Sequence, residues 1–183
     1  MKSKIDKEQY LSFLDQIEDT PKKTLNLNDR VLIIDGLNTF IRAHAVNPSL
    51  NDDGMHVGAL IGFLRSIRYT IEKLQPTRCI IVFDGKGGSK RRRKIYPNYK
   101  SNRKTKSRLN RNVDWSTSPA DEQESMKLQM GRLIQYLEQL PVTLISIDDI
   151  EADDTIAYIT KQVLVDSQIL IMSTDKDFLQ LTD

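Results

Sequence analysis

Short runs of apolar residues recur along the chain, each too short for a helix and typical of a buried β-strand. These runs cover 31–34, 79–83, 142–147 and 169–172. Between them stand stretches with apolar residues three or four positions apart, which predict helices that cover a sheet. The predicted helices cover 57–74, 119–140 and 151–165. Because strands that alternate with helices need crossover connections, the pattern predicts an α/β fold with a central, mostly parallel sheet flanked by helices.

Single residues set the limits of the predicted helices. Pro76 should end the first helix, because proline has no N–H to continue the hydrogen-bond ladder. Ser118 is typical of an N-cap and Pro119 of a first helical position, which together start the second helix. The polar segment 1–29 precedes the first strand, and its apolar spacing predicts a short amphipathic helix.

Length and composition exclude several classes of protein. The 183 residues, 39% of them hydrophobic, suffice for one domain with a buried core. No apolar run approaches the roughly 18 residues of a membrane span, so we expect no membrane protein. The single cysteine, Cys79, excludes an internal disulfide framework and suits a reducing cytoplasm. With only His44 and His56 available, a metal would be held mainly by oxygen ligands.

Acidic residues follow each predicted strand. They are Asp35, Asp84, Glu151, Asp153, Asp154, Asp175 and Asp177. Because the carboxyl ends of parallel strands meet at one edge of a sheet, we expect these side chains to lie close together. Gathered carboxylates repel one another, and Mg²⁺ or Mn²⁺ relieves the repulsion. Two such ions can bind a phosphate, activate water and stabilise a leaving oxygen, which is what phosphodiester hydrolysis needs.

Each acid also has a simpler interpretation on its own. Asp35 and Asp84 precede glycine and are typical of turns, and acids at 151–154 complement a helix dipole. The metal site is favoured because all four strand ends carry acids. Glu151 and Asp153 can converge only at the entry of a helix, since they lie about 200° apart within one. Asp175 and Asp177 point to one side only if the backbone there is extended, and Asp148 and Asp149 should face solvent.

Residues 86–118, the basic segment, separate the second predicted strand from the second predicted helix. From Lys86 to Arg111 it holds 12 Lys or Arg and no Asp or Glu. Loops longer than about 15 residues are usually functional or disordered. Lysine and arginine neutralise phosphates and aromatic residues such as Tyr99 stack on bases, so we expect nucleic acid as the partner. A solvated tail or localisation signal is the alternative, and Trp115 is expected to pack at the base of the segment.

Five motifs stand in one order along residues 31–181. They are Ile34-Asp35-Gly36 with Asn38 and Arg42; Phe83-Asp84-Gly85; Arg92-Arg93-Lys94-x-Tyr96-Pro97-x-Tyr99-Lys100-x-x-Arg103; Glu151-Ala152-Asp153-Asp154; and Ser173-x-Asp175-x-Asp177-Phe178-x-Gln180-Leu181. With them the chain resembles the metal-dependent 5′-nuclease superfamily. This includes flap endonucleases, the 5′-3′ exonuclease domains of bacterial DNA polymerase I and phage ribonuclease H of the T-even type. The dipeptide Asp114-Trp115 favours the T-even ribonuclease H branch.

The resemblance implies a PIN-like catalytic core over 30–183, an extension over 1–29 and a substrate arch over 86–118. All seven acids match metal positions: by analogy Asp84, Glu151 and Asp153 serve mainly one metal, and Asp175 and Asp177 the second. The catalytic positions that bind phosphates are Arg42, Lys100 and Arg103. The positions that we assign to nucleic-acid binding are Lys90, Arg91, Arg92, Arg93, Lys94, Tyr99 and Lys104.

The function implied is a magnesium-dependent 5′-3′ exonuclease or flap endonuclease of the ribonuclease H type. It would act at 5′ ends of RNA primers or DNA flaps during replication, with a single-strand-binding protein or sliding clamp as partners, in the host cytoplasm if phage-encoded. The family continues into a helix-three-turn-helix module, and this chain stops at Asp183 before it. The alternatives are a PIN-type RNA endonuclease and a non-catalytic nucleic-acid-binding module.

Overall fold

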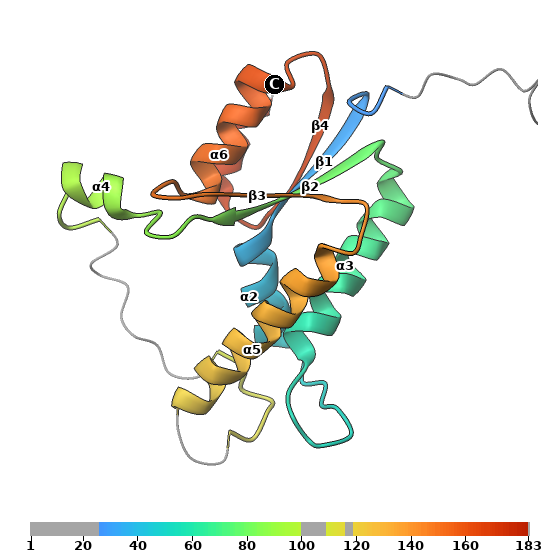
Figure 1. Cartoon of the computed structure of the whole chain (residues 1–183), viewed down its shortest axis with the longest axis vertical. Helices are drawn as coiled ribbons and strands as arrows, with labels where there is room; N and C mark the ends of the chain where they lie inside the picture. The colour runs from blue at the N-terminus through green and yellow to red at the C-terminus, as the bar shows by residue number, and fades with distance from the viewer. Residues whose placement is uncertain (1–25, 100–108, 116–118, 183) are drawn as a thin grey trace, which may run out of the picture.

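A four-stranded sheet, parallel throughout, forms the centre of the computed structural model, which describes residues 26–99, 109–115 and 119–182 (Figure 1). Its strand order is β3-β2-β1-β4. The strands are β1 (Arg30–Asp35), β2 (Arg78–Asp84), β3 (Thr143–Ile147) and β4 (Gln168–Met172). The predicted α/β class and the mostly parallel sheet are therefore confirmed.

Helices cover both faces of the sheet, with α2, α3 and α5 on one side and α6 on the other (Figure 1). The helices are α2 (Gly36–Val46), α3 (Gly58–Leu74), α4 (Lys90–Ile95), α5 (Pro119–Leu137) and α6 (Ala152–Tyr158). A π-helical turn, η1 (Ile159–Val163), continues α6, and a 3₁₀-helix, η2 (Lys176–Leu181), follows β4. None of the helices in the described ranges is long and apolar enough to cross a membrane.

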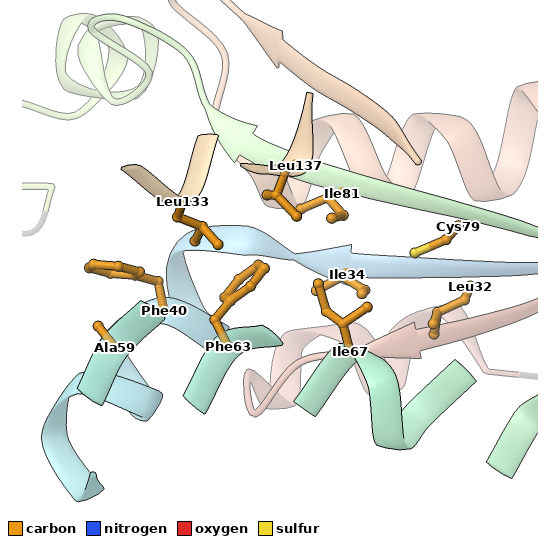
Figure 2. Close-up of a cluster of buried hydrophobic side chains, with 10 residues drawn as sticks. All are labelled: Leu32, Ile34, Phe40, Ala59, Phe63, Ile67, Cys79, Ile81, Leu133 and Leu137. Carbon is orange, nitrogen blue, oxygen red and sulfur yellow. The ribbon is translucent and has the colours of Figure 1, made fainter. Parts of the chain in front are cut away.

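Alternate residues of the central strands point into two separate cores. Leu32 and Ile34 of β1 pack with Phe40, Phe63 and residues of α5, the cluster that Figure 2 shows. Val31 and Ile33 point the other way, toward α6 and η1. Because both faces of β1 are buried, its sequence is continuously apolar rather than alternating. Burying each of these large side chains stabilises the fold by about 1.5–3 kcal/mol.

Several elements differ from the sequence-based expectations. The sequence pattern does not predict helix α2, because Asp35-Gly36 is also typical of a strand end followed by a turn; Asp35 in fact caps this helix. The short elements α4 and η2 were not predicted either. Helix α5 begins at Pro119 as predicted but ends at Leu137, and the predicted helix over 151–165 is α6 followed by the π-helical turn. The expected helix within 1–29 and the N-cap Ser118 lie outside the described residues, apart from 26–29.

Candidate metal centre

The carboxyl ends of β1 and β4 are joined through Asp35. Its Oδ1 accepts a hydrogen bond from the N–H of Asn38 (3.1 Å), which caps α2, and its Oδ2 accepts one from Ser173 Oγ (3.0 Å). Burial above all raises the pKa of Asp35, and the negative charges of Asp84 and Asp175 raise it further, against those two hydrogen bonds. Asp84 and Asp175 therefore both lie close enough to Asp35 to act on it electrostatically.

Asp84 joins the end of β2 to the beginning of α6. Its Oδ1 accepts a hydrogen bond of 2.7 Å from the N–H of Ala152, the first residue of that helix. The glycine that follows has a packing role: a Cβ at Gly85 would collide with the carbonyl oxygen of Ile147 at the end of β3. Close packing of two strand ends therefore requires the glycine after Asp84, and the hydrogen bond from Gly88 N–H to the Gly85 carbonyl oxygen (2.9 Å) also forms a turn there.

Glu151, Asp153 and Asp154 surround one cation, the guanidinium of Arg92. Arg92 Nη1 lies 2.6 Å from Glu151 Oε2 and 3.1 Å from Asp153 Oδ2, and Nη2 lies 2.7 Å from Asp154 Oδ1. Glu151 is the N-cap of α6 in extended conformation and Asp153 lies in its first turn, so the two converge at the helix entry, as their spacing requires. Glu151 is only 4% exposed.

Tyr99, a residue of the basic segment, contacts the same cluster of Arg92 and carboxylates. Its hydroxyl donates to Glu151 Oε2 (2.9 Å) and accepts from Arg92 Nη1 (2.6 Å), while the guanidinium lies 5.4 Å from the centre of the Tyr99 ring. Burial opposes the charge of Arg92, but the hydrogen bonds to Tyr99 and Asp154 and the nearby carboxylates hold its pKa above the ordinary value. The base of the basic segment is thereby fixed against the acidic residues.

Asp175 and Asp177 lie at the start of η2. The Asp175 side chain accepts a hydrogen bond from the N–H of Asp177 (3.0 Å), so the backbone turns here and the extended arrangement that would align the two side chains is not formed. The N–H of Asp175 donates to Ser173 Oγ (3.1 Å), and Asn38 Oδ1 accepts from Thr174. Ser173 and Asn38 position the acids; both stand in the sequence motifs, but the pattern alone assigned them no role.

The donor set has the chemistry that Mg²⁺ and Mn²⁺ prefer, since it consists of carboxylate oxygens. Arg92 is a stand-in cation, which shows that three of these carboxylates already converge on a positive charge. In the part of the chain that the structure describes, no three His, Cys, Asp or Glu side chains are gathered as a ready metal site.

The predicted phosphate-binding and nucleic-acid-binding cations divide into three groups. Arg42 is exposed on α2 and lines a groove of about 580 Å³ with Asn38 and Ser173, next to the acidic edge. Lys100, Arg103 and Lys104 lie outside the described residues. The other predicted cations are on α4, where all except Arg92 are exposed: Lys90, Arg91, Arg93 and Lys94.

Asp148 and Asp149 are exposed, as expected, and both contact the start of the basic segment. Asp148 Oδ1 accepts from the N–H of Lys86 (3.2 Å), and Asp149 Oδ1 lies 3.5 Å from Lys90 Nζ. These contacts fix the turn after β3 to the beginning of the basic segment.

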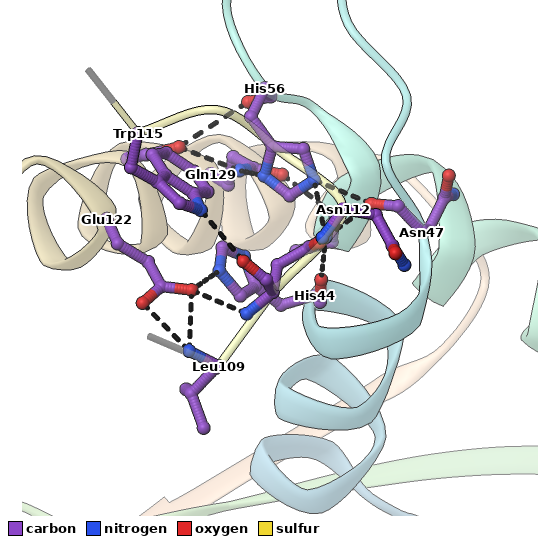
Figure 3. A network of polar contacts seen from close by, with 11 residues as sticks. His44, Asn47, His56, Leu109, Asn112, Trp115, Glu122 and Gln129 are labelled. Atoms are coloured by element: carbon purple, nitrogen blue, oxygen red, sulfur yellow. Dashed lines mark hydrogen bonds and ion pairs between the residues drawn. The ribbon is translucent and has the colours of Figure 1, made fainter. Parts of the chain in front are cut away.

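A buried polar network fixes the other end of the basic segment to α2 and α5 (Figure 3). Glu122, 4% exposed, accepts hydrogen bonds from the N–H groups of Leu109 and Asn110 and from His44 Nε2 (3.0 Å). The Trp115 indole N–H donates to the carbonyl oxygen of Asn110 (3.0 Å), and Trp115 is buried. The expected packing of Trp115 at the segment base is confirmed, and His44 belongs to the same buried network.

The surroundings of His44 favour its neutral form in the folded chain. Burial lowers its pKa below the ordinary 6.5, although the hydrogen bond to Glu122 acts in the opposite direction. With Nε2–H donating to Glu122, the unprotonated Nδ1 is buried without a hydrogen-bond partner. A second proton would therefore add an unpaired charge inside the protein.

This network predicts that acid destabilises the fold. Because the pKa of His44 is lower in the folded chain, below pH 6.5 the unfolded chain binds this proton more readily, so stability is present above that pH and is lost as pH falls. From pH 7.5 to 5.5 the loss from this group is at most about 1.4 kcal/mol. Urea unfolding at both pH values measures it, and His44→Gln, which keeps a donor to Glu122, should show a smaller loss. An identical loss in both proteins would contradict the buried neutral histidine.

Comparison with known proteins decides the family. A sequence model described as "5'-3' exonuclease, N-terminal resolvase-like domain" matches residues 30–183. The chain belongs to the 5′-3′ exonuclease family. Its members are nucleases that hydrolyse phosphodiesters, and the resemblance inferred from the motifs is thus confirmed.

Relatives in this family are longer than the chain. It is 35% identical over 154 residues to the flap endonuclease Xni of Shewanella woodyi, covering 82% of this chain and 52% of the relative. It is 34% identical over 163 residues to the DNA polymerase I of Treponema pallidum, covering 87% of this chain and 14% of that protein. The chain thus spans about half the length of the nuclease relative and a smaller part of the polymerase.

Solved structures share the fold. The D15 protein of T5, co-crystallised with metal ions, matches with a TM-score of 0.62 at 22% identity, over 84% of this chain and 51% of that one. A complex of bacteriophage T5 D15 flap endonuclease with DNA and metal ions matches with a TM-score of 0.60 at 20% identity, over 81% and 50%. The catalytic-core fold expected for the 5′-3′ exonuclease family is therefore confirmed.

Proposed function

We propose that the chain is the nuclease core of a divalent-metal-dependent 5′-3′ exonuclease or flap endonuclease. Its substrates would be 5′ ends of RNA primers or DNA flaps during replication. The observation that carries the proposal is the single acidic edge: residues from the ends of all four strands lie there, and the basic segment begins beside them. The core would extend over 30–183, with the arch at 86–118 and an extension at 1–29.

The carboxylates of this edge would hold Mg²⁺, or Mn²⁺ in its place, at two positions. They are Asp35, Asp84, Glu151, Asp153, Asp154, Asp175 and Asp177. Bound divalent ions would supply a nucleophile from water and stabilise charge on the phosphate. Asp35 is oriented for this by Ser173 and the N–H of Asn38, and Asp84 by the N–H of Ala152.

Cationic residues would bind the substrate backbone at the same edge. Arg42, Lys100 and Arg103 would contact the scissile or a neighbouring phosphate, and the exposed cations of α4 would contact the nucleic acid that leads to it. Tyr99 would act beside them as a base-stacking group. The T5 flap endonuclease matched above was crystallised with DNA and metal ions, which supports a nucleic-acid substrate for this chain. A single-strand-binding protein or a sliding clamp would be the replication partner, and the ribonuclease H type of phage enzyme remains the branch that the Asp114-Trp115 pair favours.

The test is cleavage of a labelled 5′-flap duplex by the chain, with Mg²⁺ and with EDTA. We expect Mg²⁺-dependent products that start at the 5′ end or at the flap junction, because the acidic edge and the basic segment together select a free 5′ end. A primer of RNA on DNA serves as the second substrate. The same assay is run on a fusion to the C-terminal half of the Shewanella relative, which the chain alone does not span.

The controls separate the competing functions. Faster cleavage of plain single-stranded RNA than of the flap duplex would identify an RNA endonuclease instead. Salt-sensitive binding to the duplex without Mg²⁺-dependent hydrolysis, by the chain and by the fusion, would identify a binding module and contradict the proposal.

A further inference from the structure

Arg92 belongs by sequence to the basic segment, but its side chain lies among the acidic residues. The other cations of α4 are exposed, whereas the Arg92 side chain is 32% exposed and contacts three carboxylates. A guanidinium has five N–H donors in a rigid fork, which suits several carboxylates at once. Arg92 therefore pairs with the acidic cluster, and its side chain is half-buried.

The charges explain why a cation must be there. Glu151, Asp153 and Asp154 converge at the entry of α6, and the Glu151 side chain is 5% exposed, so water screens it poorly. Without a positive charge, three neighbouring carboxylates would repel one another and separate. The same carboxylates are proposed ligands of a divalent ion, so the guanidinium and the ion compete for one set of oxygens.

We propose that Arg92 is a positioning residue: a resident counter-cation that keeps Glu151, Asp153 and Asp154 together until a divalent ion takes its place. The inference rests on the proposed function, because it assumes that these carboxylates bind metal. Tyr99 supports the arrangement, since its ring lies beside the guanidinium and its hydroxyl donates to Glu151. Arg92 leaves the cluster when the ion binds and is then available to a phosphate.

The position of α4 depends on this contact. The helix has six residues, none of them buried, so it is not held by a hydrophobic face. Arg92 and the Lys90–Asp149 pair connect its side chains to the rest of the core. Displacement of Arg92 therefore removes one of these two attachments of α4, and metal loading is coupled to the position of the cations at the base of the basic segment.

The test is binding of Mn²⁺ to the full chain, measured by isothermal titration calorimetry without nucleic acid. Arg92→Gln removes the competing cation, and we expect it to bind Mn²⁺ about tenfold more tightly than the wild type. Arg93→Gln is the matched control, because it removes the same charge from an exposed neighbour on the same helix. Arg92→Lys keeps the positive charge but loses the forked guanidinium, so its Mn²⁺ affinity should lie between those of the wild type and Arg92→Gln.

Hydrogen exchange of residues 89–99 gives a second measurement. Mn²⁺ should raise exchange there in the wild type, whereas Arg92→Gln should exchange fast before metal is added. Equal Mn²⁺ affinities for all variants, or unchanged exchange on metal addition, would overturn the role of Arg92 and leave the metal site intact. Absence of Mn²⁺ binding in every variant would overturn the metal site, and with it the proposed function. Circular dichroism confirms that each variant is folded.

Discussion

Replacement of Asp84 by asparagine is expected to lower Mg²⁺-dependent cleavage by about 10³-fold or more. Asparagine has the size of aspartate and keeps an oxygen that accepts the Ala152 N–H, so the junction between β2 and α6 should be retained. The variant lacks only the negative charge, which a bound divalent ion requires. The initial rate of cleavage of the 5′-flap duplex measures the effect. The assay uses the chain or the fusion, according to which of them cleaves that substrate.

The control for Asp84→Asn is Asp149→Asn, which removes a charge from the turn at the same edge. Asp149 has φ 63°, a left-handed conformation that asparagine also adopts, and it is not among the proposed metal ligands. Its cleavage rate should stay within about threefold of the wild type, because an exposed ion pair contributes little. Fluorescence anisotropy should show unchanged DNA binding by Asp84→Asn. Undiminished cleavage by this variant would remove Asp84 from the site.

The sheet could be predicted because burial leaves a direct mark on the sequence. A strand buried on both faces is continuously apolar, and Val31–Ile34 has that pattern because the two cores take alternate residues. Helix α2 could not be predicted in the same way. Its N-cap is Asp35, and a carboxylate before glycine is equally typical of a turn. Only the hydrogen bond from the N–H of Asn38 to the Asp35 side chain distinguishes a helix cap from a turn.

The acidic edge could be predicted because parallel strands place their carboxyl ends together, whatever the details of the loops. The partners of each acid could not. Arg92 lies 59 positions before Glu151 in the chain, and the charge pattern favours nucleic acid for every cation of the basic segment alike. Only the packing of α4 and Tyr99 beside α6 shows that this one arginine contacts the carboxylates.

The network at the far end of the basic segment was predicted only in part. Trp115 is expected at the base of this segment, but Glu122 stands in the first turn of the predicted helix over 119–140, where an exposed acid is typical. It is buried instead, and the N–H groups of Leu109 and Asn110 together with His44 hold its pKa below the ordinary value although burial alone would raise it. Such a role depends on contacts between distant segments, and no local pattern contains it.

Glu122→Ala is accordingly expected to destabilise the fold by about 3 kcal/mol, since it leaves the buried Asn110 N–H and His44 Nε2, and the part-buried Leu109 N–H, without an acceptor. For a chain of this size that lowers the melting temperature by about 6–12 °C. Urea unfolding and thermal melting measure the loss. Hydrogen exchange should also rise over 109–115, because these residues would lose their attachment to α5.

Two variants on the same helix test whether the buried acceptor is responsible. Glu122→Gln keeps one accepting oxygen and should cost about half as much, because one N–H group stays paired. Glu124→Ala removes an exposed carboxylate two positions along and should change stability by less than about 0.5 kcal/mol. Equal losses for Glu122→Ala and Glu124→Ala would show that the network does not hold the segment. A large loss for Glu122→Ala alone would show that the base of the basic segment is fixed to the core by one buried carboxylate.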